Sequence, residues 1–142
     1  MAIRFEKGDV LPDLTKAPIT KEQLKAYAEA SEDSNPIHID EDAAKQAKLP
    51  GVIAHGMLTM GFMGEFMYQV LAEIKKMQNG DGTKNPRLHE LNCRFKAMTF
   101  PGDVITVSGV VHDYNGQALI CELETKKQTG EVTATGKATI TF

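Results

Sequence analysis

The stretch Asp33–Met67, DSNPIHIDEDAAKQAKLPGVIAHGMLTMGFMGEFM, carries the features around which the rest of the chain is organised. It opens with Asp33 and His38, and His55-Gly56-Met57 follows seventeen residues after His38. The composition from Asp33 to Gly51 is polar and contains prolines, with one short helix expected over 41–47 after an Asp40 cap. We therefore expect an ordered surface segment that leads directly into a long apolar helix.

That helix is expected over 57–77, because its apolar residues recur at three- and four-residue spacing and form one stripe. Gly61 and Gly64 each cost about 1 kcal/mol relative to alanine in a helix interior. We expect a sheet or a ligand to approach the backbone at these glycines. The stripe also contains methionines, for which core packing is favoured over an adaptable acyl pocket: Met57, Met60, Met63 and Met67.

The flanking segments predict one further helix and a sheet. Residues 4–7 read as a short strand before a Gly8-Asp9 turn, and Thr20-Lys-Glu-Gln23 has the form of a capping box that starts a helix over about 21–31. After an exposed connection at 79–86, the apolar period changes to two. Strands are expected at 91–97, 104–111, 117–127 and 132–142, separated by turns at Pro101-Gly102-Asp103, Asn115-Gly116 and Thr129-Gly130.

The last strand has the clearest alternation. Ala134, Gly136 and Ala138 lie on the side expected to face inward, while Thr133 and Thr135 lie on the other. Small inward residues would let a helix lie close to the sheet. The sequence therefore predicts an α+β fold, with one long helix against an antiparallel sheet of about five strands.

The composition narrows the class of protein. At 142 residues the chain suits a single domain spanning 1–142, and its net charge of −3 gives no footprint for nucleic acid or an anionic membrane. The N-terminal residues lack the apolar run of a signal peptide, and no segment approaches the roughly 18 apolar residues of a membrane span. We expect a cytoplasmic protein whose Cys93 and Cys121 are small buried side chains, with neither a disulfide nor a metal.

The chemistry predicted for the opening stretch is general acid–base catalysis. Asp33 and His38, on a segment stiffened by Pro36, can hydrogen-bond one water molecule, and their ordinary pKa values of about 3.9 and 6.5 suit proton transfer near neutrality. Asn35 would hold this pair or the water in register. Gly56, at a helix start, would offer its N–H to an oxygen that gains negative charge. This combination suits hydration of a polarised double bond, or the reverse dehydration.

The motifs Asp33-Ser-Asn-Pro-Ile-His38-Ile-Asp40 and Ile53-Ala-His-Gly-Met-Leu-Thr-Met-Gly61 resemble those of the MaoC-like hydratases and dehydratases, the (R)-specific enoyl-CoA hydratases of the hotdog superfamily. The resemblance implies a hotdog fold and a dimer in which two sheets join. It also implies catalysis on (R)-3-hydroxyacyl and trans-2-enoyl thioesters of coenzyme A or acyl carrier protein, without a metal or redox cofactor. A homodimer is expected, with a heterodimer left open.

Carried over to this chain, the resemblance makes Asp33 and His38 the catalytic pair, Asn35 the orienting residue and the Gly56 N–H the oxyanion site. Some relatives have a hydroxyl residue near the site where this chain has Gly64, so a serine-assisted variant is not expected. Three further histidines are left out of the catalytic set. His55 is expected to cap or position the helix start, and His89 and His112 are expected to be structural.

Two alternative functions stay open at this stage. One is a non-catalytic hotdog subunit that binds acyl chains or supports an active partner, although the intact catalytic motif argues against it. The other is a hotdog thioesterase, which would release free thiol from acyl-CoA. The sequence leaves open the chain length, the carrier, the physiological direction and which member of the Asp33–His38 pair is the base.

Overall fold

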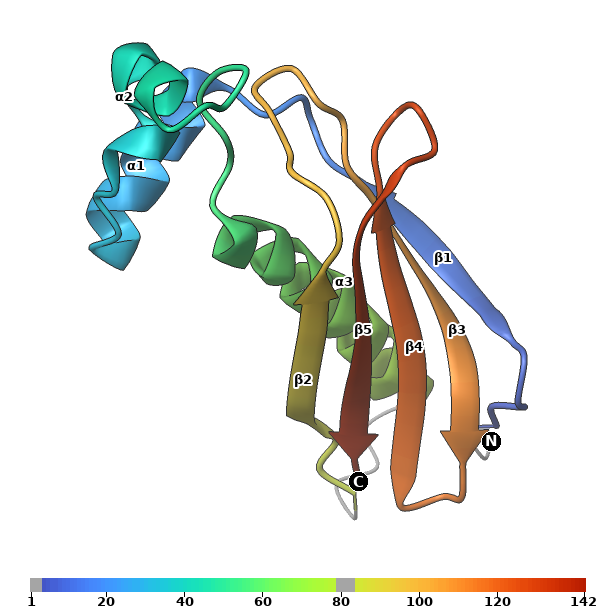
Figure 1. The fold of residues 1–142 in the computed structure, drawn as a ribbon. Helices are drawn as coiled ribbons and strands as arrows, with labels where there is room; N and C mark the ends of the chain where they lie inside the picture. The colour runs from blue at the N-terminus through green and yellow to red at the C-terminus, as the bar shows by residue number, and fades with distance from the viewer. Residues whose placement is uncertain (1–3, 79–83) are drawn as a thin grey trace.

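One long helix lies against the inner face of a five-stranded antiparallel sheet (Figure 1). The computed structural model describes residues 4–78 and 84–142. The strands are ordered β1-β3-β4-β5-β2, so β1 and β2 are the two edges. In chain order the elements are β1 (Val10–Thr15), α1 (Lys21–Ser31), the 3-10 helix η1 (Pro36–His38), α2 (Glu41–Gln46), α3 (Gly56–Met77), β2 (Arg87–Phe95), β3 (Thr106–Tyr114), β4 (Ala118–Lys126) and β5 (Val132–Thr141).

The predicted long helix is confirmed as α3, and its apolar stripe faces the sheet. Met63 and Met67 are fully buried in the main core cluster, where core packing was expected, whereas Met57 is largely exposed. Burial of each large apolar side chain stabilises the fold by about 1.5–3 kcal/mol. The buried residues of the helix are Thr59, Phe62, Met63, Phe66, Met67, Val70, Leu71 and Ile74.

Two glycines of the sheet allow α3 to lie close to it. A Cβ on Gly109 would sit 2.7 Å from the Phe66 ring, and a Cβ on Gly136 would sit 3.2 Å from the Met63 sulfur and 2.5 Å from the Asn92 carbonyl oxygen of β2. The small inward residues of β5 therefore serve the purpose expected of them. The glycines of the helix differ, because nothing within 4 Å approaches Gly61, and Leu91 is 3.9 Å from a Cβ on Gly64. No described part of the chain explains Gly61 by close approach.

The N-terminal prediction was wrong in position. Residues 4–7 form no strand, and the first strand is β1, which begins after the turn at Gly8 and contains Pro12. Proline is tolerated there because β1 is an edge strand, with its register shifted between Leu11 and Leu14. Pro12 and Pro18 had been taken to exclude a long helix here and to favour an edge strand or a lead-in, and β1 is indeed an edge strand.

The hairpin turns at Gly116 and Gly130 are confirmed, each with a positive φ that favours glycine. The strand limits differ by a few residues, since β2 begins at Arg87 and β3 runs from Thr106 to Tyr114. Thr133 is a clearer correction: it was expected to face outward, but it is 1% exposed at a register shift and its hydroxyl lies 2.7 Å from that of Thr125. Of the predicted connection over 79–86, residues 79–83 lie outside the described residues.

The segment that leads to the site is built on local caps. The capping box at Thr20 and Gln23 is present and starts α1, while Asp40 Oδ1 accepts hydrogen bonds from the first turn of α2. In Figure 1, α1 and α2 lie together beyond the N-terminal end of α3, away from the open side of the sheet. Among the described residues, no helix combines the length and hydropathy needed to cross a bilayer.

Candidate active site

Asp33 and Asn35 form a tight polar turn immediately before η1. The Asn35 side-chain oxygen caps the 3-10 helix by accepting from the Ile37 N–H at 3.2 Å, and Pro36 fills the first helical position. The Asp33 carboxylate accepts a hydrogen bond from the Asn35 backbone N–H at 3.3 Å. Asn35 therefore contacts Asp33 through its backbone, while its side chain shapes the turn that carries His38. Its predicted role in orienting the pair stays a prediction.

His38, the last residue of η1, has one ring nitrogen tied to the backbone. The side chain is buried, and Nδ1 lies 2.7 Å from the carbonyl oxygen of Ile53. Since a carbonyl oxygen only accepts, Nδ1 must carry the proton of this bond. In the neutral ring the lone pair is then on Nε2, where it can accept a proton.

His55 is the N-cap residue of α3, but its ring makes no capping hydrogen bond. The side chain is only 2% exposed, and its Nε2 donates to the Asp33 backbone carbonyl at 3.1 Å. Its ring stacks on that of His38, with centroids 3.8 Å apart and an interplanar angle of 22°, and packs in a T-shaped arrangement with Tyr27, with centroids 4.8 Å apart. The expected position at the helix start is correct. Its contacts with Asp33 and His38 were not expected.

The three side chains bring a carboxylate and two imidazoles together. One carboxylate oxygen of Asp33 and one nitrogen each of His38 and His55 lie within 4.8 Å of one another. This is a donor set that transition metals accept. One nitrogen of each ring already bonds a backbone carbonyl, which leaves the lone pairs on Nε2 of His38 and Nδ1 of His55 in the neutral rings. The cluster therefore combines a carboxylate with an imidazole nitrogen that can accept a proton.

Gly56 is the first residue of α3, next to these groups. No side chain caps this helix start, so its first N–H groups are available for an external oxygen. A Cβ on Gly56 would lie 3.0–3.2 Å from ring atoms of Phe95 at the end of β2. The backbone bond from the Ala54 N–H to the Thr99 carbonyl, 2.7 Å long, fixes the approach to the helix.

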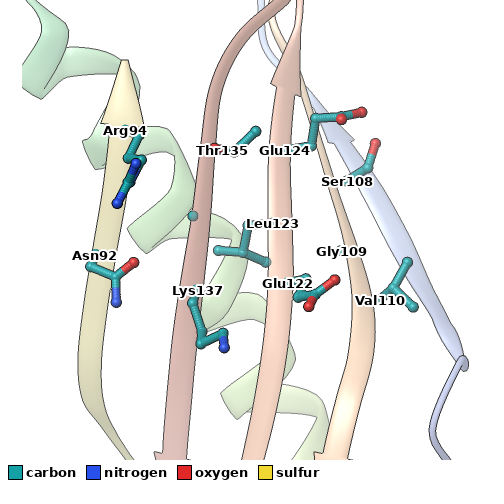
Figure 2. Close-up of a pocket in the computed structure, with 11 residues that line it drawn as sticks. Asn92, Arg94, Ser108, Gly109, Val110, Glu122, Leu123, Glu124, Thr135 and Lys137 are labelled. Carbon is teal, nitrogen blue, oxygen red and sulfur yellow. The ribbon is translucent and has the colours of Figure 1, made fainter. Parts of the chain in front are cut away.

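Two hollows elsewhere on the chain are lined by other residues. One, of about 430 Å³, lies across the sheet on the face opposite α3, where Figure 2 shows Arg94, Lys137, Glu122 and Glu124. On the same sheet His112 pairs with Glu122 at 3.0 Å, which fits the structural role expected for that histidine. The other, of about 490 Å³, is apolar and lies along the C-terminal half of α3, between Phe66 and Met77.

The site can therefore hold a water molecule between a carboxylate and a basic imidazole nitrogen, beside the positive end of a helix. Asp33 is exposed, so the site is open to small molecules, whereas His38 is buried and fixed. Asp33, His38 and Gly56, which the sequence proposed as site residues, lie at the same end of α3, and their roles stay predictions. Sequence reasoning missed the contacts of His55 and Tyr27, and only the adjacency of His55 to Gly56 signalled them.

Known proteins share both the sequence pattern and the fold. Residues 7–137 match the family described as MaoC like domain. The chain is 30% identical over 97 residues to the peroxisomal hydratase-dehydrogenase-epimerase of Saccharomyces cerevisiae, covering 68% of this chain but only 9% of that protein. The curated relatives of this kind are far longer than the matching region.

Two solved structures cover almost the whole chain. The (R)-hydratase from A. caviae involved in PHA biosynthesis has a TM-score of 0.73 at 25% identity and covers 99% of each chain. The ChsH1–ChsH2 complex from Mycobacterium tuberculosis has a TM-score of 0.76 at 16% identity, covering 98% of this chain and 99% of that one. The long helix and five-stranded antiparallel sheet are thus confirmed as a hotdog fold. The chain belongs to the MaoC-like hydratase and dehydratase family.

Proposed function

We propose that the protein catalyses the reversible hydration of trans-2-enoyl thioesters to (R)-3-hydroxyacyl thioesters. The family supports hydration or dehydration of acyl thioesters in general. The observation that carries the finer proposal is the cluster of Asp33 and His38 beside the uncapped N-terminus of α3. A water molecule, a base and an oxyanion site are the three requirements of this reaction.

In the hydration direction, the free Nε2 of His38 takes a proton from a water molecule that Asp33 also holds. The water oxygen forms a bond to C3 of the enoyl group, and the π electrons move to the thioester carbonyl oxygen. The Gly56 N–H stabilises the negative charge on that oxygen. C2 then takes a proton from the same acid–base pair, which restores the thioester. The Nδ1–H bond to Ile53 supports His38 as the base, because it leaves Nε2 unprotonated.

The substrate would be carried by coenzyme A or acyl carrier protein, and a second hotdog chain would complete the assembly. The surface that supports pairing with a second chain is the free edge of β2 together with the adjacent face of α3. It carries exposed apolar side chains beside the open space at Gly61. An unpaired nine-residue strand edge is a ready template for pairing with another chain. The exposed apolar residues are Met57, Tyr68, Phe95 and Met98.

The test is the enoyl absorbance of crotonyl-CoA and of a longer trans-2-enoyl-CoA after addition of pure protein, with chiral analysis of the product. Loss of absorbance with (R)-product is expected. Asp33→Asn and His38→Gln should each lower turnover at least about 10²-fold, the range for a positioned acid or base. His112→Gln, far along the sheet, is the matched control and should leave turnover unchanged.

Near-normal turnover in either well-folded site variant would refute the assignment of Asp33 and His38. Release of free thiol without a change in enoyl absorbance would identify a thioesterase instead. If neither substrate reacts, the same assay with enoyl-acyl carrier protein separates a carrier-specific enzyme from a supporting subunit.

A further inference from the structure

His55 links the three parts of the candidate site. Its backbone caps α3 directly before Gly56, its Nε2 donates to the backbone of Asp33, and its ring lies flat on the ring of His38. Asp33 and His55 are 22 positions apart in sequence, and their hydrogen bond ties the catalytic turn to the helix start.

The burial of His55 fixes its ring in one orientation. The side chain is almost fully enclosed, with the edge of Tyr27 from α1 against one part of the ring and His38 against its face. Donation to the Asp33 carbonyl requires the proton on Nε2. The remaining nitrogen, Nδ1, is buried without a hydrogen-bond partner among the described residues. An unpaired buried polar atom is costly, so its retention calls for a role.

We propose that His55 is a positioning residue for the reaction, which acts by holding the His38 ring and the Asp33 turn in register with the Gly56 N–H. This inference rests on the proposed hydration. The two histidines have opposite tautomers, since His38 is protonated on Nδ1 and His55 on Nε2. Stacking keeps the His38 ring from turning, so its Nε2 stays directed at the water shared with Asp33.

The loss of turnover expected without the His55 ring follows from how the His38 ring is held. His38 has a second constraint, the 2.7 Å bond to Ile53, which fixes one nitrogen but allows the ring to rock about that bond. The stacked ring of His55 blocks that rocking. A displacement of about 1 Å in a catalytic group can lower turnover by roughly 10²-fold. The effect should fall on kcat, because His55 stands behind His38 and would not itself touch substrate.

The first test needs no substrate, and it uses variants only to assign the histidine signals. Nuclear magnetic resonance of wild-type protein with ¹⁵N-labelled histidine, at mildly alkaline pH, reports the tautomer of each neutral ring. The chain has four histidines, which single His→Gln variants assign. The expected result is Nδ1–H for His38 and Nε2–H for His55. Nε2–H at His38, or Nδ1–H at His55, would overturn the proposal.

The second test is kinetic and uses three substitutions of His55. His55→Phe keeps an aromatic ring to stack, His55→Gln keeps a donor for the Asp33 carbonyl, and His55→Ala keeps neither. We expect His55→Ala to lower kcat by about 10²-fold with less than about a threefold change in KM. Each of the other two should recover part of the loss. His112→Gln is the control, because its ring pairs with Glu122 on the sheet.

A folded His55→Ala variant with kcat within about twofold of wild type, or a loss confined to KM, would contradict this role. So would failure of both conservative variants to recover activity while their circular dichroism spectra stay native. If wild type turns over no enoyl thioester, the proposed function fails. The tautomer measurement then still decides whether His38 and His55 make the backbone hydrogen bonds on which the positioning depends.

Discussion

At the scale of single residues, the chemistry of the site depends on which nitrogen of each histidine ring is hydrogen-bonded to the backbone. The Ile53 carbonyl accepts a hydrogen bond from Nδ1 of His38, and the Asp33 carbonyl accepts one from Nε2 of His55. Backbone acceptors of this kind fix a tautomer without adding a charge. Asp33 is left as the one carboxylate in the cluster, exposed enough to exchange water.

Residue-scale chemistry also predicts the reactivity of the cysteines. Burial raises the pKa of the Cys121 thiol to about 11, so at pH 8 only about one thiol in 10³ is ionised. We expect iodoacetamide at pH 8 to leave Cys121 unmodified in the native protein and to alkylate it after unfolding in urea. Mass spectrometry of the digested protein measures both states. Rapid alkylation of Cys121 in the native protein would contradict its burial on β4.

Asp103 gives a prediction about pH. Burial alone would raise the pKa of its carboxyl, but hydrogen bonds from the Gln128 side chain, the Phe100 N–H and Lys127 outweigh burial and lower it below the ordinary 3.8. A lowered folded-state pKa stabilises the protein above pH 3.8, and this contribution is lost as the pH falls through the folded-state pKa. Asp103→Asn should therefore destabilise by about 1–3 kcal/mol at pH 7.

Urea unfolding of wild type and Asp103→Asn at pH 7 and near pH 3 measures this difference. The gap between the two free energies of unfolding should narrow at the lower pH, because protonation removes the same charge that the substitution removes. Asp9→Asn, in an exposed turn, is the control at both pH values. An equal gap at both pH values would show that the charge of Asp103 does not stabilise the fold.

At the scale of elements, the separation of α3 from the sheet is set by glycine. Gly109→Ala places a Cβ 2.7 Å from the Phe66 ring and 3.0 Å from Leu123, and overpacking of this kind costs about 1–3 kcal/mol. Adding Phe66→Leu should return part of the loss, because the ring atoms in conflict are removed. Ser108→Ala, the neighbouring residue on the open face, should change stability by less than about 0.5 kcal/mol.

Thermal and urea unfolding of the single and double variants measures this coupling. Equal losses for Gly109→Ala with and without Phe66→Leu would show that the contact does not limit the approach of the helix. The control also matters for interpretation. A large loss for Ser108→Ala would indicate that β3 tolerates no change at all, whichever face is altered.

Some structural elements could be predicted from local sequence, and others could not. The Thr20 capping box, the Asp40 cap and the Asn115-Gly116 turn depend on residues within a few positions, and all three are confirmed. The edge strand with Pro12 and the buried Thr133 depend on partners more than 80 positions away or on a register shift between strands. No local pattern specifies such partners, so the edge strand was placed at the wrong residues and Thr133 was wrongly expected to face outward.

The candidate site also has residues that local sequence indicates and contacts that it does not indicate. Asp33 and His38 were proposed from a motif of six consecutive residues, and Gly56 from its place at an expected helix start; the roles of all three stay predictions. The contacts of His55 join α1, the turn at Asp33 and η1, which only the folded chain brings together. The position of His55 was predicted, and its contacts were not.

At the scale of the whole molecule, the open face of the sheet and the free edge of β2 differ in the side chains that they expose. The open face of the sheet carries charged side chains, with ion pairs such as Glu124–Lys126 at 3.1 Å, beside exposed Val110 and Val10 toward the β1 edge. The free edge of β2 instead adjoins exposed Met57 and Phe95, next to the site. A charged face tolerates water, whereas an apolar strand edge favours another chain.

This contrast predicts opposite outcomes for two matched substitutions. Phe95→Arg places a charge at the β2 edge, where it would be buried by a second chain, and burial of an unpaired charge costs several kcal/mol. We expect it to convert a dimer to a monomer in size-exclusion chromatography with light scattering, and to lower enoyl turnover. Val110→Arg, on the charged open face, should change neither the mass nor the turnover.

The mass of the wild-type protein in solution decides which outcome of Phe95→Arg is expected. If the chain alone is a dimer, a Phe95→Arg variant that keeps the dimer mass would place the contact elsewhere. If the chain alone is a monomer, a different hotdog chain is required, and Phe95→Arg should block its binding while Val110→Arg should not. Loss of turnover in a variant that keeps its mass would instead assign Phe95 to the site itself, because its ring already lies against Gly56 at the start of α3.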